Sequence, residues 1–316
     1  MPPVVLTIAG FDPSSGAGIT ADIKVIAAHE CYGVACATAL TVQSTQGVRR
    51  VQGVDPNVIA ETLAELVADF AIDAVHIGML GNGKIALAVA DFLTQTGLPH
   101  VVLDPILKSS SGAELLDPAG TRIVIERLLP LAELITPNFD EAIALTGLSG
   151  MEGIRAAEIP EKGKSTDSPG TTPGASAVNA ISGAQALAAM RESARLLHSF
   201  GAANVVVTGG HLEKAIDLLS FTTARGIEQE VFKAQRQRST STHGTGCAFS
   251  TALACHLAHG RGLPEAVLLS KAYVSAAIAN AQPLGHGAGP LHHLYRMHQQ
   301  PRRVAGAELD AAHSSN

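Results

Sequence analysis

Short apolar runs alternate along the chain with longer segments of helical periodicity. Each apolar run is ended by a glycine or a polar residue, which is typical of buried strands. The runs predict strands over residues 4–9, 33–43, 49–54, 74–77, 100–103, 134–135, 205–208, 216–223 and 227–232, the last two as a hairpin. The periodicity between them predicts helices over residues 19–29, 56–70, 84–96, 117–129, 139–146 and 264–281, and one that carries Cys247. Because alternating strands and helices are joined by right-handed crossovers, we expect an α/β protein whose mostly parallel sheet has helices on both faces.

One stretch breaks this pattern. Residues 149–182 are rich in Pro, Gly, Ser and Thr and have few apolar anchors, so we interpret them as a flexible surface insertion. Residues 301–316 are predicted to form a loose C-terminal tail. The rest of residues 1–300 is predicted to form a single domain.

Composition narrows the classes of protein. The chain has 316 residues, of which 46% are hydrophobic but only 3% aromatic, with no Trp. An aliphatic core of this kind suits parallel strands covered by Ala-rich helices. The net charge of −6 and the lack of a long basic block argue against a nucleic-acid partner.

The same composition bears on the compartment. No run reaches the roughly 18 apolar residues of a membrane span, and residues 1–9 fit a strand better than a signal peptide. The four cysteines show no CxxC spacing. We therefore expect a cytoplasmic protein without a membrane partner, structural disulfides or a zinc site.

A glycine-punctuated turn precedes the helix that carries Cys247. Gly244 and Gly246 let the backbone turn tightly and approach a ligand closely. The first amides of the helix have no intrahelical partner, and they and the helix dipole attract an anion. The turn therefore predicts a phosphate site. Cys247 lies in the first helical turn, where the same field favours its thiolate, so it is a candidate base or nucleophile.

Polar residues and glycines follow several predicted strands at their carboxyl ends. Asp104, Asn138, Gly209 and Gly210 occupy such positions. These ends meet at one edge of a parallel sheet, and ligands bind there. The four residues therefore predict one shared site.

Several motifs occur in a fixed order over residues 4–300, apart from the insertion. They are LTIAGFDPSSGAG at 6–18 with Ala21 and Asp22, ALTVQST at 39–45, IGML at 77–80, LDP at 103–105, ITPN at 135–138 with Glu141, GGH at 209–211, THGTGC at 242–247 and GHGAGPLHH at 285–293. In this order they resemble the hydroxymethylpyrimidine/phosphomethylpyrimidine kinases of thiamine biosynthesis, within the ribokinase-like superfamily. The resemblance implies a ribokinase-like three-layer α/β/α fold.

The resemblance also implies a reaction. It is the ATP-dependent phosphorylation of 4-amino-5-hydroxymethyl-2-methylpyrimidine and then of its monophosphate, with Mg²⁺, by a homodimer. A monovalent cation is left open. In this reaction Gly244, Thr245 and Gly246 would offer backbone N–H groups to the moving phosphoryl group, and Cys247 would take the proton of the attacking hydroxyl.

The nucleotide side follows from the same resemblance. Asp104 and Glu141 would hold Mg²⁺ through hard oxygen ligands, and Asn138, Thr208 and Gly210 would lie beside the nucleotide. Plainer interpretations stay open, namely a strand-end turn for Asp104 and helix capping for Asn138 and Glu141.

The substrate side lies in the first half of the chain. The amide of Gln43 offers donors and an acceptor, which suits the edge of an aminopyrimidine. The resemblance adds Gly10, Asp22, Val42 and Met79 to this pocket. Core packing stays open for Met79, and an exposed helix charge for Asp22.

The chain departs from the family at two basic positions. The Lys that follows the family's Asp-Pro motif is shifted to Lys108, and the Lys before Gly-Gly-His is replaced by Thr208. Lys108 and Lys214 are candidate substitutes. His211 and His243 are interpreted as phosphate, lid or turn residues, outside the catalytic set.

Other functions remain open. Pyridoxal kinase activity belongs to the same superfamily, because pyridoxal also carries a ring-bound hydroxymethyl group. A thiol hydrolase using Cys247 and His243 is a different class, although a third orienting residue is missing. A sensor that binds the pyrimidine without phosphorylating it is supported only by the displaced lysines. A NAD-dependent oxidoreductase is disfavoured, because no Gly-x-Gly-x-x-Gly follows the first strand.

Overall fold

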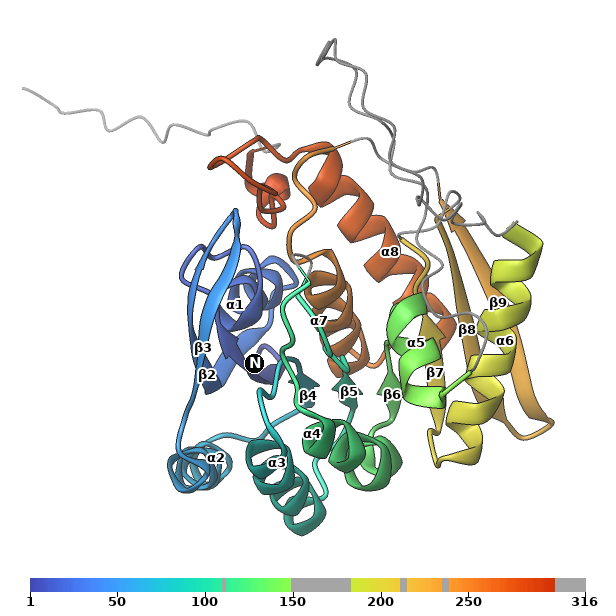
Figure 1. The fold of residues 1–316 in the computed structure, drawn as a ribbon, viewed down its shortest axis with the longest axis horizontal. Helices are drawn as coiled ribbons and strands as arrows, with labels where there is room; N and C mark the ends of the chain where they lie inside the picture. The colour runs from blue at the N-terminus through green and yellow to red at the C-terminus, as the bar shows by residue number, and fades with distance from the viewer. Residues whose placement is uncertain (110–111, 149–182, 211–214, 235–238, 299–316) are drawn as a thin grey trace, which may run out of the picture.

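The computed structural model describes residues 1–109, 112–148, 183–210, 215–234 and 239–298, which form one nine-stranded sheet flanked by helices (Figure 1). The strand order is β3-β2-β1-β4-β5-β6-β7-β8-β9. The strands are β1 (Val4–Phe11), β2 (Tyr32–Ser44), β3 (Gly47–Gly53), β4 (Ala74–Ile77), β5 (Val101–Leu103), β6 (Leu134–Ile135), β7 (Asn204–Val207), β8 (Ala215–Thr223) and β9 (Gly226–Ala234). Strands β2, β1, β4, β5, β6 and β7 pair in parallel, whereas β3 at one edge and β8 and β9 at the other pair antiparallel. The predicted mostly parallel sheet is confirmed.

Helices cover both faces of the sheet (Figure 1). One layer consists of α1 (Gly18–Ala28), α7 (Thr245–Ala258) and α8 (Leu263–Ala279). The other consists of α2 (Pro56–Asp69), α3 (Gly83–Thr96), α4 (Pro118–Ile123), α5 (Phe139–Thr146) and α6 (Gly183–Ser199). The resulting three-layer α/β/α architecture is the predicted one.

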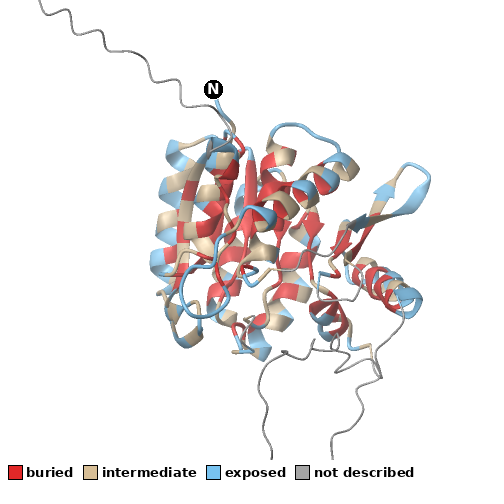
Figure 2. Ribbon diagram, turned by 90° about the horizontal axis from the view of Figure 1, so that it is seen from above, coloured by how far each residue is buried: buried red, intermediate tan, exposed pale blue. Residues whose placement is uncertain are grey.

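Each face of the sheet has its own apolar core. Successive side chains of a strand point to opposite faces, so Val5 of β1 packs with the α1, α7 and α8 layer while its neighbour Leu6 packs with the other layer. All four residues of β4 are buried. Figure 2 shows burial concentrated in the sheet and in the helix faces that meet it, while the outer end of the β8–β9 hairpin is exposed.

The helix boundaries follow local capping signals. Helix α2 starts after Asp55, whose side chain accepts from the Asn57 amide, and has Pro56 in its first turn. Helix α3 starts after Asn82, whose side chain accepts from two amides, and ends at Gly97 in the left-handed region with φ of 57°.

Two elements differ from the sequence-based expectation. The helix predicted over residues 117–129 is α-helical only over α4, and continues as a π-helical turn (Val124–Leu128) and a 3-10 turn (Leu129–Leu131). Pro130 lacks an N–H, so the segment cannot continue as a regular helix there. Helix α6 was not predicted; it begins directly after the Pro- and Gly-rich stretch, which obscured its start. The predicted insertion 149–182 and tail 301–316 lie outside the described residues.

Within the described ranges, no helix has the length and hydrophobicity needed to span a membrane.

Candidate active site

The carboxyl ends of β5 and β6 meet the first turns of α7. Asp104 follows β5, and Thr136 follows β6. Thr136 Oγ1 lies 2.8 Å from Ser250 Oγ of α7, and the Ser250 hydroxyl donates to the Gly246 carbonyl at 3.1 Å. A Cβ at Gly246 would lie 4.0 Å from Asp104 Oδ2. The glycine turn therefore lies next to the ends of β5 and β6.

The turn before α7 needs glycine for two reasons. Gly244 has φ of 79°, in the left-handed region, and a Cβ there would collide with the Gly16 carbonyl oxygen. Helix α7 starts at Thr245 and no side chain in the described chain caps it. Its first amides are therefore available to an anion, which supports the expectation for Gly244, Thr245 and Gly246.

Glu141 caps the start of its own helix. Its carboxylate accepts from the Asn138 amide at 2.9 Å, and Asn138 Oδ1 accepts from the Glu141 amide at 2.9 Å, so the two residues form a capping box at the start of α5. Helix capping is therefore confirmed. The same bonds hold the Glu141 carboxylate towards Asp104 at the end of β5.

The two carboxylates disfavour each other's charge. Burial raises the pKa of Glu141 to about 8, helped by the negative charge of Asp104. Burial likewise raises the pKa of Asp104 to about 6, with a further contribution from Asp22 that His76 opposes. Two buried carboxylates short of positive charge are a favourable place for a cation.

These carboxylates fit Mg²⁺ as partial ligands. Among the described residues no group of three or more His, Cys, Asp or Glu side chains is arranged to hold a metal ion. Mg²⁺ commonly uses one or two carboxylates and completes its octahedron with phosphate oxygens and water. Asp104 and Glu141 meet that description.

Thr208 follows β7, and its backbone pairs with that of Asn138 in an isolated parallel β-bridge. Gly210 is exposed, and Gly209 N donates to Asp217 Oδ1 at 3.0 Å. Asp217 also pairs with Lys271 of α8. Lys271 is thus a cation behind this strand end that sequence reasoning missed.

The two lysines proposed as substitutes have different outcomes. Lys108 is exposed, and its backbone pairs with that of Glu114 in an isolated antiparallel β-bridge within the loop after β5. Lys214, like His211, lies outside the described residues. Nothing in the described chain therefore tests Lys214, whereas Lys271 lies against the end of β7.

Cys247 differs from the expectation for its ionisation. The helix N-terminus was expected to favour the thiolate. Instead, desolvation by the surrounding protein raises the pKa of Cys247 well above its usual range, and the charges of Asp104 and Asp22 act in the same direction. An amide hydrogen bond from Gly18 opposes this only in part. Cys247 as a whole residue is half-buried.

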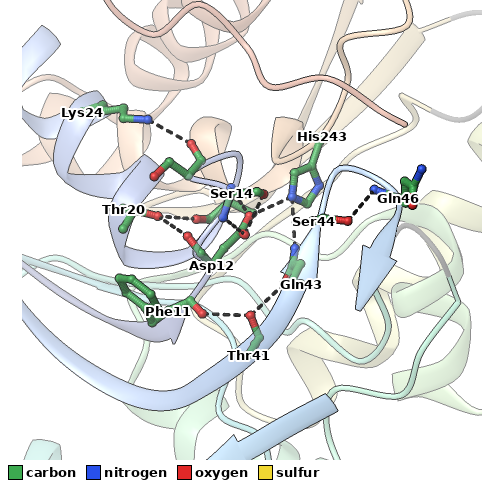
Figure 3. Close-up of polar contacts among 12 residues, drawn as sticks. Phe11, Asp12, Ser14, Thr20, Lys24, Thr41, Gln43, Ser44, Gln46 and His243 are labelled. Carbon is green, nitrogen blue, oxygen red and sulfur yellow. Dashed lines mark hydrogen bonds and ion pairs between the residues drawn. The ribbon is translucent and has the colours of Figure 1, made fainter. Parts of the chain in front are cut away.

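Gln43 lies at the end of β2 in a network that joins distant segments (Figure 3). Its amide contacts the Thr41 hydroxyl at 3.1 Å and the His243 ring at 3.2 Å. His243 in turn lies 2.9 Å from Asp12 Oδ2. Because the ring Nε2 faces Asp12 and Gln43, the arrangement does not support the hydrolase alternative, in which His243 would activate Cys247.

The other substrate-side residues divide into two groups. A Cβ at Gly10 would lie 3.0 Å from Met79 Sδ, so these two residues are in contact. Met79 is 7% exposed and packs with Ala39, so core packing applies to it as well. Val42 is 49% exposed, and the β2–β3 pairing shifts register between Val42 and Gln43. A place for Val42 in the substrate pocket stays a prediction.

Asp22 is placed differently from both expectations. It is neither an exposed charge nor a wall of the pocket, because it is fully buried. Its carboxylate accepts from the Thr7 and Thr251 hydroxyls, each at 2.8 Å, and lies 3.4 Å from His76 Nδ1. Burial alone would lower the pKa of His76, but the Asp22 charge and hydrogen bond raise it. Asp22 therefore joins β1, β4 and α7 behind the site.

Replacing Asp22 by alanine is expected to lower the free energy of unfolding by about 3–5 kcal/mol, because it removes one partner of a buried ionic network. Urea unfolding of wild type and variant measures the difference. Asp69→Ala, at the exposed end of α2, is the matched control and should change stability by less than about 0.5 kcal/mol. A loss below about 1 kcal/mol for Asp22→Ala would contradict the network's structural role.

Sequence reasoning missed several residues of the site. Asp12 lies within the motif at 6–18, and His243 precedes the glycine turn, so both were in view but had no assigned partner. His76 and Thr251 occur within apolar runs, where a polar residue is the signal of a buried network. Their partners are distant in sequence, so only the fold identified them.

The sequence profile of the phosphomethylpyrimidine kinase family matches residues 12–164 and 171–292. The chain is 39% identical over 292 residues to the thiamine biosynthesis bifunctional protein ThiED of Geobacter sulfurreducens, covering 92% of this chain but 52% of that protein. It is 37% identical over 294 residues to the hydroxymethylpyrimidine/phosphomethylpyrimidine kinase of Escherichia coli, covering 92% of this chain and 97% of that protein.

Among solved structures, the ADP complex of Bacillus subtilis pyridoxal kinase is similar, with a TM-score of 0.74 and 30% identity. The similarity covers 94% of this chain and all of that chain (100%). The shared architecture, the glycine turn before α7 and the match of the family profile to most of this chain all point to the same family. The chain therefore belongs to the phosphomethylpyrimidine kinase family.

Proposed function

We propose that the protein transfers a phosphoryl group from ATP to the hydroxymethyl group of 4-amino-5-hydroxymethyl-2-methylpyrimidine, and then to the resulting monophosphate, in thiamine biosynthesis. One observation carries this proposal. The uncapped first turn of α7, with Cys247 in it, meets the Asp104 and Glu141 carboxylates at the carboxyl ends of the parallel strands. An anion site beside a cation site is what phosphoryl transfer needs.

The chain's own residues have distinct tasks in this reaction. The amides of Gly244, Thr245 and Gly246 stabilise the negative charge on the transferring phosphoryl group. Cys247 accepts the proton of the attacking hydroxyl. Bound Mg²⁺, held through Asp104 and Glu141, would neutralise charge on the phosphates of ATP. Asn138, Thr208 and Gly210 flank the nucleotide at the ends of β6 and β7.

Gln43 is proposed to bind the pyrimidine edge. Its carboxamide offers a donor and an acceptor side by side, and we expect Gly10 and Met79, which are in contact with each other, to supply an apolar surface for the ring. The adjoining β2–β3 hairpin opens onto a cavity of about 490 Å³ that is lined by Ser44, Arg49 and Gly112, among others.

A coupled assay of ADP formation tests the function. With the purified protein, ATP and Mg²⁺, we expect turnover of the hydroxymethylpyrimidine and of its monophosphate. Pyridoxal is tested in parallel. If neither pyrimidine is phosphorylated, the proposed function is wrong. Any measurable phosphate transfer to a pyrimidine also excludes the silent sensor.

Pyridoxal kinase activity remains the second candidate. It is favoured by the similarity to the Bacillus subtilis pyridoxal kinase structure. Pyridoxal has no amino group beside its ring nitrogen, so it cannot use both halves of the Gln43 amide in the way that the aminopyrimidine does. We therefore expect the pyrimidine to have the larger kcat/KM.

Assembly and compartment are also proposals. The resemblance favours a cytoplasmic homodimer, and the exposed apolar side chains of Leu40 and Val42 on β2, 53% and 49% exposed, would suit an interface between two copies. A role for a monovalent cation stays open to titration.

A further inference from the structure

Asp12, His243 and Gln43 form a chain of polar contacts between three segments (Figure 3). Asp12 lies in the loop after β1, His243 in the turn before α7, and Gln43 at the end of β2. His243 Nε2 lies 2.9 Å from Asp12 Oδ2 and 3.2 Å from Gln43 Nε2. One ring atom thus faces both a carboxylate and a carboxamide.

The state of Asp12 determines what that ring atom can do. Asp12 is buried, and its carboxylate accepts from the Ser14 amide and hydroxyl and from the Ala17 amide. Burial acts to raise the pKa of Asp12, but the hydrogen bonds from His243 and Ser14 outweigh it and lower that pKa. The carboxylate is therefore ionised and can only accept. His243 Nε2 must carry the proton in their contact.

That proton in turn determines the orientation of the Gln43 amide. A protonated ring nitrogen cannot accept from an NH₂ group, so the amide atom that faces His243 must be the oxygen. On the other side, the Thr41 hydroxyl has one proton and two neighbours, the Phe11 carbonyl at 2.9 Å and the Gln43 carboxamide at 3.1 Å. When that proton goes to the shorter contact with Phe11, Thr41 accepts from Gln43 and the NH₂ group faces it.

The orientation that His243 requires thus also satisfies Thr41. It is related to the one drawn in Figure 3 by a half-turn of the amide, which exchanges oxygen and nitrogen with almost no change in shape. His243 itself has little freedom, because its backbone amide donates to the Gly289 carbonyl at 3.1 Å and its ring lies against Gly16, where a Cβ would collide with it. The contact of His243 with the Gln43 carboxamide is therefore held in one geometry.

With one N–H used by Thr41 and one oxygen lone pair used by His243, the Gln43 carboxamide has one N–H and one lone pair left for a ligand. Because the amide cannot turn over, these two groups face the ligand in one fixed order. An aminopyrimidine edge has an acceptor ring nitrogen next to a donor amino group, whereas an oxopyrimidine edge has a donor N–H next to an acceptor carbonyl. The ring cannot turn over to compensate, since its hydroxymethyl group must reach Cys247. The two ligand classes therefore need opposite orientations of Gln43.

We propose that Asp12 and His243 are positioning residues that lock the Gln43 carboxamide and thereby make the site select aminopyrimidines over their oxo counterparts. The inference rests on the proposed function, because it takes a pyrimidine as the ligand of Gln43. Neither residue touches the reacting atoms; both act through Gln43.

The test compares two substrates in wild type, His243→Phe and Asp12→Asn. The substrates are 4-amino-5-hydroxymethyl-2-methylpyrimidine and its 4-oxo analogue, followed by kcat/KM and by calorimetric Kd without ATP. Wild type should prefer the amino compound by at least about tenfold, the cost of one buried unpaired polar group. In both variants the ratio should fall towards one, with the larger change in KM and Kd rather than kcat, since positioning of a bound edge is lost.

Ser14→Ala is the matched control. It removes one donor to Asp12 but leaves the contact with His243, so the wild-type ratio should persist. Circular dichroism checks the folding of each variant. If His243→Phe does not fold, the substrate ratio of Asp12→Asn alone tests the proposal. The proposal is overturned if the folded variants keep the wild-type ratio, or if wild type does not discriminate. If wild type neither binds nor phosphorylates either pyrimidine, the proposed function itself fails.

Discussion

Replacing Cys247 by alanine is expected to lower kcat by about 10²–10⁴-fold, the usual contribution of a general base. ATP should still bind, because the Gly244–Gly246 amides and the Asp104 and Glu141 carboxylates remain. Turnover of the hydroxymethylpyrimidine, together with calorimetric titration of ATP, measures both quantities. An alanine variant with near wild-type kcat would remove Cys247 from the catalytic set.

The pH profile of the same reaction follows from the environment of the thiol. Since burial and the nearby carboxylates raise the pKa of Cys247, the thiol is protonated at neutral pH. The base form increases as pH rises, so kcat/KM should climb between about pH 6 and pH 9, by up to about tenfold per unit. Cys247→Asp supplies a base that ionises at lower pH and should flatten this rise. An alkaline rise that is unchanged in Cys247→Asp would assign it to another group.

Replacing Glu141 by glutamine is expected to weaken apparent Mg²⁺ affinity by roughly 10–100-fold. The carboxylate supplies negative charge that the amide cannot, and its burial leaves few alternatives. Mg²⁺ titration of ATP turnover measures the change. Asp140→Asn, an exposed acidic residue on the same helical turn, is the matched control and should leave the titration almost unchanged. Equal curves for Glu141→Gln and wild type would exclude Glu141 as a ligand.

The same titration should depend on pH with a defined sign. The pKa values of Asp104 and Glu141 are raised to about 6 and about 8, so protons compete with the metal below these values. Apparent Mg²⁺ affinity should therefore increase from pH 6 to pH 8 in wild type. The upper half of that increase should be lost in Glu141→Gln. Affinity that is constant across this window would mean that neither carboxylate binds the metal directly.

Much of the architecture was determined by the sequence alone. Apolar runs such as 74–77, which is β4, and the capping residues of α2 and α3 set the elements locally, because burial on both faces and unsatisfied helix ends constrain the residue types. The strand-end positions of Asp104 and Asn138 followed from the alternation of strands and helices. Helix α6 escaped prediction because it begins directly after the Pro- and Gly-rich stretch, which obscured its start.

The tertiary structure alone decided how the site residues are paired and charged. Gln43 and His243 are 200 residues apart, and Asp22 and Thr251 are 229 apart, so no local pattern connects them. The ionisation of Cys247 also depended on the fold: the helix N-terminus was evident from the sequence, but the burial and the Asp104 and Asp22 charges that outweigh it were not. Hydrophobic periodicity and helix capping depend on residues a few positions apart in the sequence. Desolvation and charge–charge interactions depend on which residues are neighbours in space, and those neighbours are determined only when the chain is folded.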